Sequence, residues 1–162
     1  IGSGAAANGF SGAAGLAAAL KMDRQKNRVF CLLGDGELQE GQIWEAAMFA
    51  AHHKLDNLIA IVDNNALQAG GNLRAVVGID SIVDKFESFG LKAIPVRDGH
   101  DFEELLGAFE RALEVQRRPT VLIASTISGK GVSFAENKSY YHGAAFSDQE
   151  LAAALKELTI NN

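Results

Sequence analysis

Cysteine is almost absent from this sequence, since Cys31 is the only one in 162 residues. A single thiol excludes an intrachain disulfide framework, and its place inside an apolar run, residues 29–33, predicts a buried and inert side chain. A protein without disulfides fits a reducing compartment, so we expect a cytoplasmic location. The sequence also lacks any apolar run near the roughly 20 residues that cross a bilayer, so we expect no membrane association.

An excess of basic charge is lacking too. The formal net charge is −5, which gives no positive field to attract nucleic acid or an anionic membrane. Hydrophobic residues make up 48% and charged residues 22%, as in an ordinary globular protein. The length suffices for one domain with a core. The chain begins with Ile1 and not Met, so we expect the natural start, with any targeting segment, to lie upstream.

Four short apolar runs are typical of strands. They cover residues 29–33, 58–62, 91–96 and 120–125. The second and fourth runs are apolar on both faces, which fits a parallel sheet covered on both sides by helices. We therefore predict an α/β fold, a doubly wound parallel sheet with right-handed crossovers. We expect it to form a single domain over residues 1–162.

Helical patterns separate these runs. One predicted helix begins near Phe10, and the others cover residues 42–53, 81–89, 101–116 and 147–158. Two of them open with the spacing of a capping box: Asp101 is followed by Glu104, and Ser147 by Glu150. In such a box, we expect the first side chain to cap the helix and the second to reach back to the backbone of the first.

Polar residues follow two of the predicted strands at the point where each strand ends. Asp35, flanked by Gly34 and Gly36, follows the run 29–33, and Asn65 follows the run 58–62. If these strands are neighbours, both side chains point into one crevice at the carboxyl edge of the sheet. Their oxygens suit Mg²⁺ or Ca²⁺ better than zinc. Two side chains do not complete such a site, so we expect a diphosphate to add ligands, with the glycines allowing its close approach.

Five stretches together resemble transketolase. They are GDGELQEGQIWEAA from Gly34, KLDNLIAIVDNN from Lys54, DGHD from Asp98, SGKGVSF from Ser128 and YYHG from Tyr140. The resemblance is to the diphosphate-binding part of the thiamine-diphosphate domain of that family, and it covers nearly the whole chain from about Phe10. It implies a thiamine-diphosphate-binding fold that lacks its amino-terminal part.

The resemblance implies a role for each matching residue at the cofactor. Asp35 and Asn65 resemble the two side-chain ligands of Mg²⁺. Leu67 matches the position whose backbone carbonyl completes the metal shell. Gly34 and Gly36 would contact the diphosphate.

Two further residues match positions close to the reaction. Glu40 matches an acid at the subunit contact between two active sites, and His142 matches a histidine assigned to proton transfer near the diphosphate and the substrate. The implied reaction moves a two-carbon ketol unit between a ketose phosphate and an aldose phosphate, as in the pentose phosphate pathway. The implied cofactors are thiamine diphosphate and Mg²⁺, with Ca²⁺ as an alternative ion.

The chain departs from the family pattern in ways that imply a partner. The family loop Gly-Ser-Leu-Gly-Gln-Gly reads GAAANG at residues 4–9, and the front part of the family domain is missing. The pyrimidine-binding domain is also missing, with the glutamate that activates the cofactor. We therefore expect an amino-terminal subunit, or a fragment of one, that is active only with a carboxyl-terminal transketolase subunit, in a two-fold heterotetramer.

Other interpretations stay open. The chain could be half of another thiamine-diphosphate enzyme, such as a 2-oxoacid dehydrogenase alpha chain, although ELQEGQIWEA and the late HG fit this poorly. It could be a non-catalytic scaffold subunit, which the altered loop at 4–9 favours, or a mononucleotide-binding module. We interpret Glu37 as a solvated helix start, His52 and His53 as solvated, and Trp44 as core or interface packing.

Overall fold

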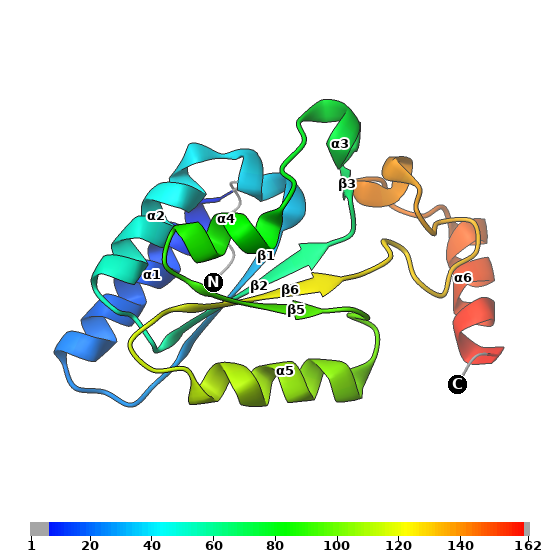
Figure 1. The fold of residues 1–162 in the computed structure, drawn as a ribbon. Helices are drawn as coiled ribbons and strands as arrows, with labels where there is room; N and C mark the ends of the chain where they lie inside the picture. Colours follow the sequence, from blue (N-terminus) through cyan, green and yellow to red (C-terminus); the bar gives the residue numbers. More distant parts are fainter. Residues whose placement is uncertain (1–6, 161–162) are drawn as a thin grey trace. The chain divides into compact units, whose positions relative to one another are not determined.

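Two compact units make up the part of the chain that the computed structural model describes, residues 7–160. The first unit contains the residues up to Asn64 together with Ile79–Thr126. The second contains Asn65–Gly78 together with the residues from Ile127 onward. Figure 1 shows the elements of both units, each of which is described here by itself.

The first unit is built on a parallel sheet. Its strands are β1 (Val29–Gly34), β2 (Leu58–Asn64), β5 (Lys92–Val96) and β6 (Thr120–Ser125), in the spatial order β1-β2-β6-β5. All neighbouring pairs are parallel. Each strand coincides with a predicted apolar run to within two residues, and the predicted doubly wound α/β class is confirmed.

Helices cover both faces of this sheet (Figure 1). One face carries α1 (Asn8–Met22), α2 (Gly41–His52) and α4 (Ile82–Ser88), whereas α5 (Phe102–Glu114) lies on the other. A 3-10 helix, η1 (Asp35–Gln39), joins β1 to α2. The central strand β2 is buried from both sides because it has helices above and below it, as its continuous apolar sequence predicts.

The indole of Trp44 packs inside the first unit. Its ring lies 5.1 Å from the ring centroids of both Phe86 and Phe89, which fixes α2 against α4. Its Nε1–H donates to the carbonyl of Leu38 at 3.0 Å, so the polar end of the ring is satisfied. Of the two uses predicted for Trp44, core packing is the one that the structure shows.

The capping box predicted at α5 forms only in part. The Asp101 carboxylate accepts from the backbone N–H groups of Glu103 and Glu104, as an N-cap should. The Glu104 carboxylate, however, accepts from the backbone N–H groups of Arg97 and Asp98. Glu104 therefore closes the turn after β5, because the N–H groups of Arg97 and Asp98 need an acceptor there. The predicted reciprocal bond from the Asp101 N–H to Glu104 does not form, so that part of the prediction was wrong.

The second unit contains short elements that the sequence patterns did not predict. A hairpin pairs β3 (Leu67–Gln68) with β4 (Gly71–Asn72) and is followed by α3 (Leu73–Val76), while η2 (Ser139–His142) precedes α6 (Asp148–Ile160). Val132, Ala135 and Ala154 form a small core with the rings of Phe134, Tyr141 and Phe146 around it. The helix predicted at 147–158 is confirmed as α6.

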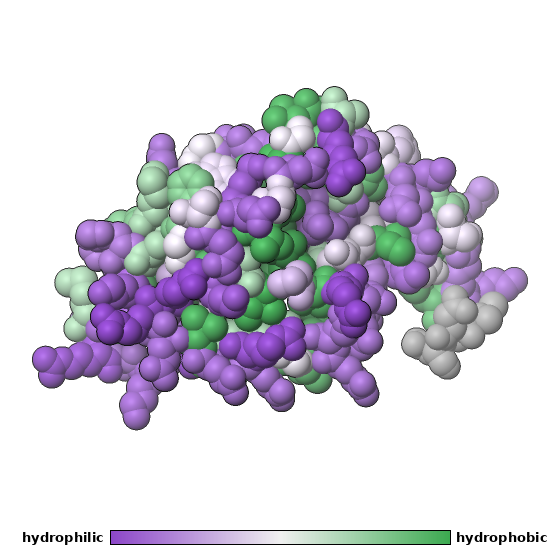
Figure 2. All heavy atoms as spheres, viewed as in Figure 1, coloured by the Kyte–Doolittle hydropathy of each residue, from purple (hydrophilic) through white to green (hydrophobic). Residues whose placement is uncertain are grey.

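The face of the protein seen in Figure 2 is mostly polar. Figure 2 shows charged and polar side chains over most of the visible face, with apolar side chains gathered over α3, where Val76 and Val77 are exposed. Within residues 7–160, none of the helices has both the length and the apolar character that crossing a membrane requires.

The second predicted capping box forms completely. The Ser147 hydroxyl accepts from the Glu150 N–H at 3.3 Å, and the Glu150 carboxylate accepts from the Ser147 N–H at 2.8 Å. The same carboxylate accepts from the Tyr141 hydroxyl at 2.6 Å and from the Ser147 hydroxyl at 2.7 Å. These donors, the Tyr141 hydroxyl first, lower the pKa of Glu150 from 4.5 to about 2.

We predict that this carboxylate contributes stability that depends on pH. Because the pKa is lower in the folded state, the contribution is present above the ordinary pKa of 4.5 and is lost as the pH falls toward 2. The difference in thermal midpoint between the unsubstituted protein and Glu150→Gln should therefore be largest at neutral pH and shrink in acid. Tyr141→Phe, which removes one donor, should reproduce part of the difference. A midpoint difference that is the same at every pH would contradict the assignment.

Candidate functional site

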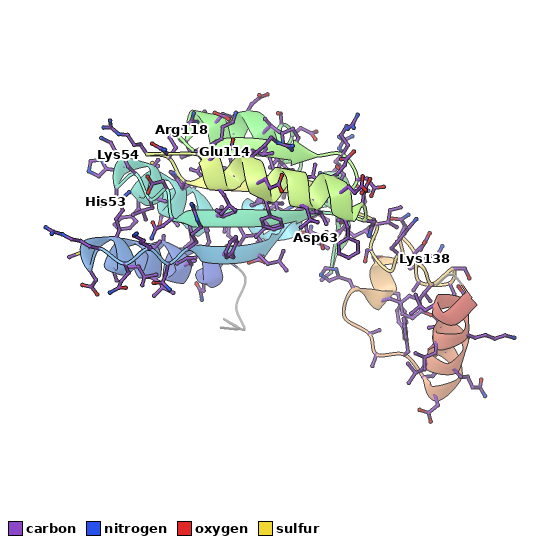
Figure 3. All side chains as sticks on the ribbon, turned by 90° about the horizontal axis from the view of Figure 1, so that it is seen from below. His53, Lys54, Asp63, Glu114, Arg118 and Lys138 are labelled. Carbon is purple, nitrogen blue, oxygen red and sulfur yellow. The ribbon has the colours of Figure 1, made fainter. Side chains whose placement is uncertain are left out.

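In the first unit, the residues predicted for the site lie at the carboxyl edge of the sheet. β1 and β2 pair in parallel with Gly34 opposite Asp63, so the two strands end side by side. Asp35 directly follows β1, and Asn65 directly follows β2 and begins the second unit. Figure 3 shows Asp63 at this end of the sheet, with His53 and Lys54 at the opposite end. The position of His53 supports its interpretation as a solvated residue.

Asp35 is a buried carboxylate. It is 1% exposed, and among the described residues only Thr120 is another buried polar side chain. A carboxylate away from water is stable only when hydrogen bonds or a cation compensate its charge. Asp35 therefore has the chemistry and the burial that a ligand of a hard divalent cation needs.

Glu37 holds two loops together, which its interpretation as a solvated helix start did not anticipate. Its Oε1 accepts from the backbone N–H of Gly34 at 2.9 Å, and its Oε2 accepts from the N–H of Ala7 at 2.6 Å. The carboxylate thus ties the turn after β1 to the residue that caps α1. The spacing of Gly34 and Glu37 is that of a helix N-cap and its third residue, a signal that the sequence contained.

Ala7, the N-cap of α1, is the first described residue of the loop before that helix. Ala7 is buried and has a φ of 66°, a left-handed conformation that costs a residue with a Cβ about 1 kcal/mol or more. The bond to Glu37 offsets part of that cost. The rest of the altered family loop, Gly4 to Ala6, lies outside the described residues.

The end of β6 is joined to the end of β2 by side chains and to the turn after β5 by a backbone contact. The Thr126 hydroxyl donates to the Asp63 carboxylate, and the Gly99 N–H donates to the carbonyl of Ser125 at 2.7 Å. A Cβ at Gly99 would lie 2.6 Å from the Thr126 methyl, so only glycine fits this approach. The DGHD turn is therefore packed over the end of β6.

In the second unit, Asn65 and Leu67 form a local turn. The Asn65 Oδ1 accepts from the Leu67 backbone N–H at 2.9 Å, and Leu67 begins β3. Both residues are half-buried. Such an Asx turn fixes the Asn65 side chain relative to the backbone that follows it.

His142 ends η2 in the same unit and is exposed. β3 packs against η2. A hollow of about 520 Å³ lies there, lined by Ala69, Ser139, Tyr140, His142 and Gly143. The structure thus brings the short element that starts at Leu67 beside the short helix that ends at His142.

The predicted site residues fall into two groups. Gly34, Asp35, Gly36 and Glu40 lie in η1 or directly beside it in the first unit; Gly36 is half-buried within η1, and Glu40 is exposed between η1 and α2. Asn65, Leu67 and His142 belong to the second unit. Within residues 7–160 there is no cluster of three or more His, Cys, Asp or Glu that could hold a metal. A metal here would need amide, carbonyl or phosphate oxygens besides Asp35.

Cys31 behaves as its sequence position predicts. It is buried, and burial together with the nearby Glu37 carboxylate raises the pKa of its thiol. A thiol of this kind is a poor nucleophile at neutral pH.

Comparisons of this chain with known proteins point to one family. The family model described as "Transketolase, thiamine diphosphate binding domain" matches residues 2–162. The chain is 40% identical over 155 residues to the 6-deoxy-6-sulfo-D-fructose transketolase subunit SqwG of Clostridium sp., covering 96% of this chain and 56% of that protein. It is 42% identical over 144 residues to human transketolase, covering 88% of this chain and 22% of that one. The chain therefore spans about half the length of its bacterial subunit relative.

Solved structures agree with this result. The crystal structure of transketolase from Campylobacter jejuni superposes with a TM-score of 0.81 at 32% identity, covering 95% of this chain and 24% of that one. The fold, the motifs around Asp35 and the match over almost the whole length point to the same assignment. The chain belongs to the transketolase family, as a thiamine diphosphate-binding domain of that family.

Proposed function

We propose that this chain binds Mg²⁺ and the diphosphate of thiamine diphosphate as the amino-terminal component of a transketolase. The observation that carries the proposal is the buried carboxylate of Asp35 directly after β1, with Asn65 directly after the neighbouring strand β2. Bound thiamine diphosphate would supply the carbanion chemistry for ketol transfer. The role of the chain is to hold the charged end of the cofactor.

The donor set suits magnesium. Asp35 supplies the negative charge, Asn65 an amide oxygen and Leu67 a backbone carbonyl, all of which are hard oxygen ligands. Mg²⁺ is usually held by few carboxylates and completed by phosphate oxygens and water, which agrees with the single acid at this position. Gly34 and Gly36 expose the backbone on both sides of Asp35, and we propose that they contact the diphosphate.

The substrates that we propose are sugar phosphates. The transketolase reaction transfers a two-carbon ketol unit from a ketose to an aldose. One relative is named for 6-deoxy-6-sulfo-D-fructose and another, from Phocaeicola vulgatus, for apulose 4-phosphate. These names support an anionic ketose as the donor. We further propose that His142 exchanges a proton with the substrate and that Glu40 lies at a subunit contact near the reaction.

A partner subunit is part of the proposal. The relatives from Clostridium and Phocaeicola are named as subunits, and this chain spans 56% of each. We propose a partner with the pyrimidine-binding domain, and a two-fold assembly with two copies of each chain.

We predict that cofactor binding depends on a divalent cation held by Asp35. With the partner present, thiamine diphosphate should bind in Mg²⁺ or Ca²⁺ and not in a chelator. Asp35→Ala should abolish binding, because the metal loses its one charged side-chain ligand. Titration calorimetry measures this directly. Asp98→Asn, which changes an exposed acid after β5, is the matched control and should bind normally. Tight binding by Asp35→Ala would refute the metal assignment.

We predict a separate effect at His142. His142→Ala should lower turnover by about 10²- to 10⁴-fold if the imidazole transfers a proton, while cofactor affinity stays unchanged. His53→Ala is the control, because His53 lies at the amino end of the sheet away from Asp63 (Figure 3). Steady-state kinetics and calorimetry on the complex separate the two effects. Full activity of His142→Ala would leave this residue without a catalytic role.

We predict that the chain self-associates through the surface of α1 and α2. Leu16, Met48 and Phe49 are 47%, 52% and 42% exposed there, although these two helices pack on each other. Light scattering over a series of concentrations should show association, and Met48→Lys should weaken it because a charge is poorly tolerated in an apolar interface. Glu45→Lys, an exposed change on the same helix, should have little effect. A monomer at every concentration would oppose a role of this surface in assembly.

A further inference from the structure

The DGHD turn after β5, residues 98–101, places its glycine against the end of β6. The Gly99 N–H donates to the Ser125 carbonyl at 2.7 Å, and a Cβ at Gly99 would lie 2.6 Å from the Thr126 methyl. The turn is closed by Asp98, whose Oδ1 accepts from the His100 N–H at 2.9 Å. Thr126 therefore has its methyl group packed against the backbone of a closed turn.

This contact selects the direction of the Thr126 hydroxyl. A threonine side chain is branched at Cβ, so fixing the methyl group also fixes the hydroxyl. The hydroxyl donates to the Asp63 carboxylate, and the Thr126 backbone N–H donates to the Asn64 carbonyl at 3.2 Å. Two bonds from one residue thus hold the last two residues of β2. Asp63 and Thr126 are both half-buried, so water competes only in part for the bond between their side chains.

These bonds join two points at which the chain leaves the first unit. Asn64 and Thr126 each end a segment of that unit, and the second unit continues at Asn65 and Ile127. Asn65 then forms its own turn, because its Oδ1 accepts from the Leu67 N–H at 2.9 Å. The segment that begins with Asn65 therefore starts from a residue that Thr126 holds directly.

We propose that Thr126 is a positioning residue for the divalent cation. Gly99 orients its hydroxyl, and through Asp63 that hydroxyl fixes the end of β2. It thereby sets the point from which Asn65 and Leu67 reach the ion. The inference rests on the proposed function, in which these two residues supply oxygen ligands. In this role Asp63 acts through the backbone of β2 and does not itself contact the cation.

The first test is a titration of thiamine diphosphate binding with Mg²⁺ in the complex with the partner. Thr126→Val keeps the shape of the side chain and removes the hydroxyl. It should raise the Mg²⁺ concentration for half-maximal binding about 10- to 100-fold, as the loss of a group that holds a metal ligand usually does. Thr126→Ser keeps the hydroxyl but loses the methyl that meets Gly99, so it should fall between Thr126→Val and the unsubstituted protein.

The control for this titration lies on the same strand. Thr120→Val removes a buried hydroxyl from the amino end of β6, away from Asp63, and should leave the Mg²⁺ requirement unchanged. A normal Mg²⁺ requirement for Thr126→Val would overturn the proposal. A Thr126→Ser variant as impaired as Thr126→Val would do the same, because the hydroxyl would then not be the acting group.

Substitutions of Asp63 test whether Thr126 acts through it. Asp63→Ala should raise the Mg²⁺ requirement, and adding Thr126→Val should raise it no further, because the bond between them is already lost. Asp63→Asn keeps an oxygen that can accept from the hydroxyl and should lose much less than Asp63→Ala. Additive losses, or equal losses for Asp63→Asn and Asp63→Ala, would contradict a positioning role.

Hydrogen exchange separates this inference from the cofactor assignment. In the complex without cofactor, the Leu67 amide should exchange about two- to tenfold faster in Thr126→Val, as the loss of one hydrogen bond allows. The Ile61 amide in the middle of β2 should stay equally protected. If Asp35→Ala bound the cofactor tightly, the metal assignment would fail, but this exchange would still report whether Thr126 orders the Asn65 turn. Equal exchange of Leu67 in both proteins would overturn the positioning role.

Discussion

The register between β1 and β2 is the constraint on which the candidate site depends. Gly34 lies opposite Asp63, so the chain leaves the sheet at two adjacent points, and Asp35 and Asn65 follow those points directly. A slip of one residue would exchange the buried and exposed sets of β1, which makes the register costly to change. The positions from which Asp35 and Asn65 start are thus set by the packing of the core.

Electrostatics then explains why the proposed cofactor would need a metal. Asp35 and Glu37 place two carboxylates within three residues, and Glu37 is held by the N–H groups of Gly34 and Ala7. A diphosphate brought to the same loop would meet both carboxylates, and like charges at short range repel strongly where water is excluded. A divalent cation on Asp35 offsets the charge of these two carboxylates, so the diphosphate no longer meets a net negative charge there. In this view, Glu37 shapes the loop and Asp35 holds the ion.

The sequence predicted the elements whose signals are local and repeated. The strands follow from continuous apolar runs, which are buried in the sheet, and α6 begins at the capping box of Ser147 and Glu150. Both signals act within a few neighbouring residues, so the sequence alone reveals them. The hairpin of β3 and β4 was not predicted, since two-residue strands have no periodicity to detect. The contact of Glu37 with Ala7 spans 30 residues and depends on how two loops meet, which no local pattern contains. The roles of Asp35, Asn65 and His142 came from the family motif and stay predictions.

Exposed apolar residues of the first unit lie on both faces of its sheet. Phe30 and Leu32 belong to the face that carries α5, whereas Met48 and Phe49 belong to α2 on the other face. Covering a large apolar side chain contributes about 1.5–3 kcal/mol, so both surfaces favour contact. The surface of α2 with Met48 and Phe49 belongs to a helix whose backbone hydrogen bonds are made within the helix. Side-chain packing alone therefore suffices to cover it. Association through α2 therefore needs only side-chain packing, which is why a charge placed at Met48 should weaken it.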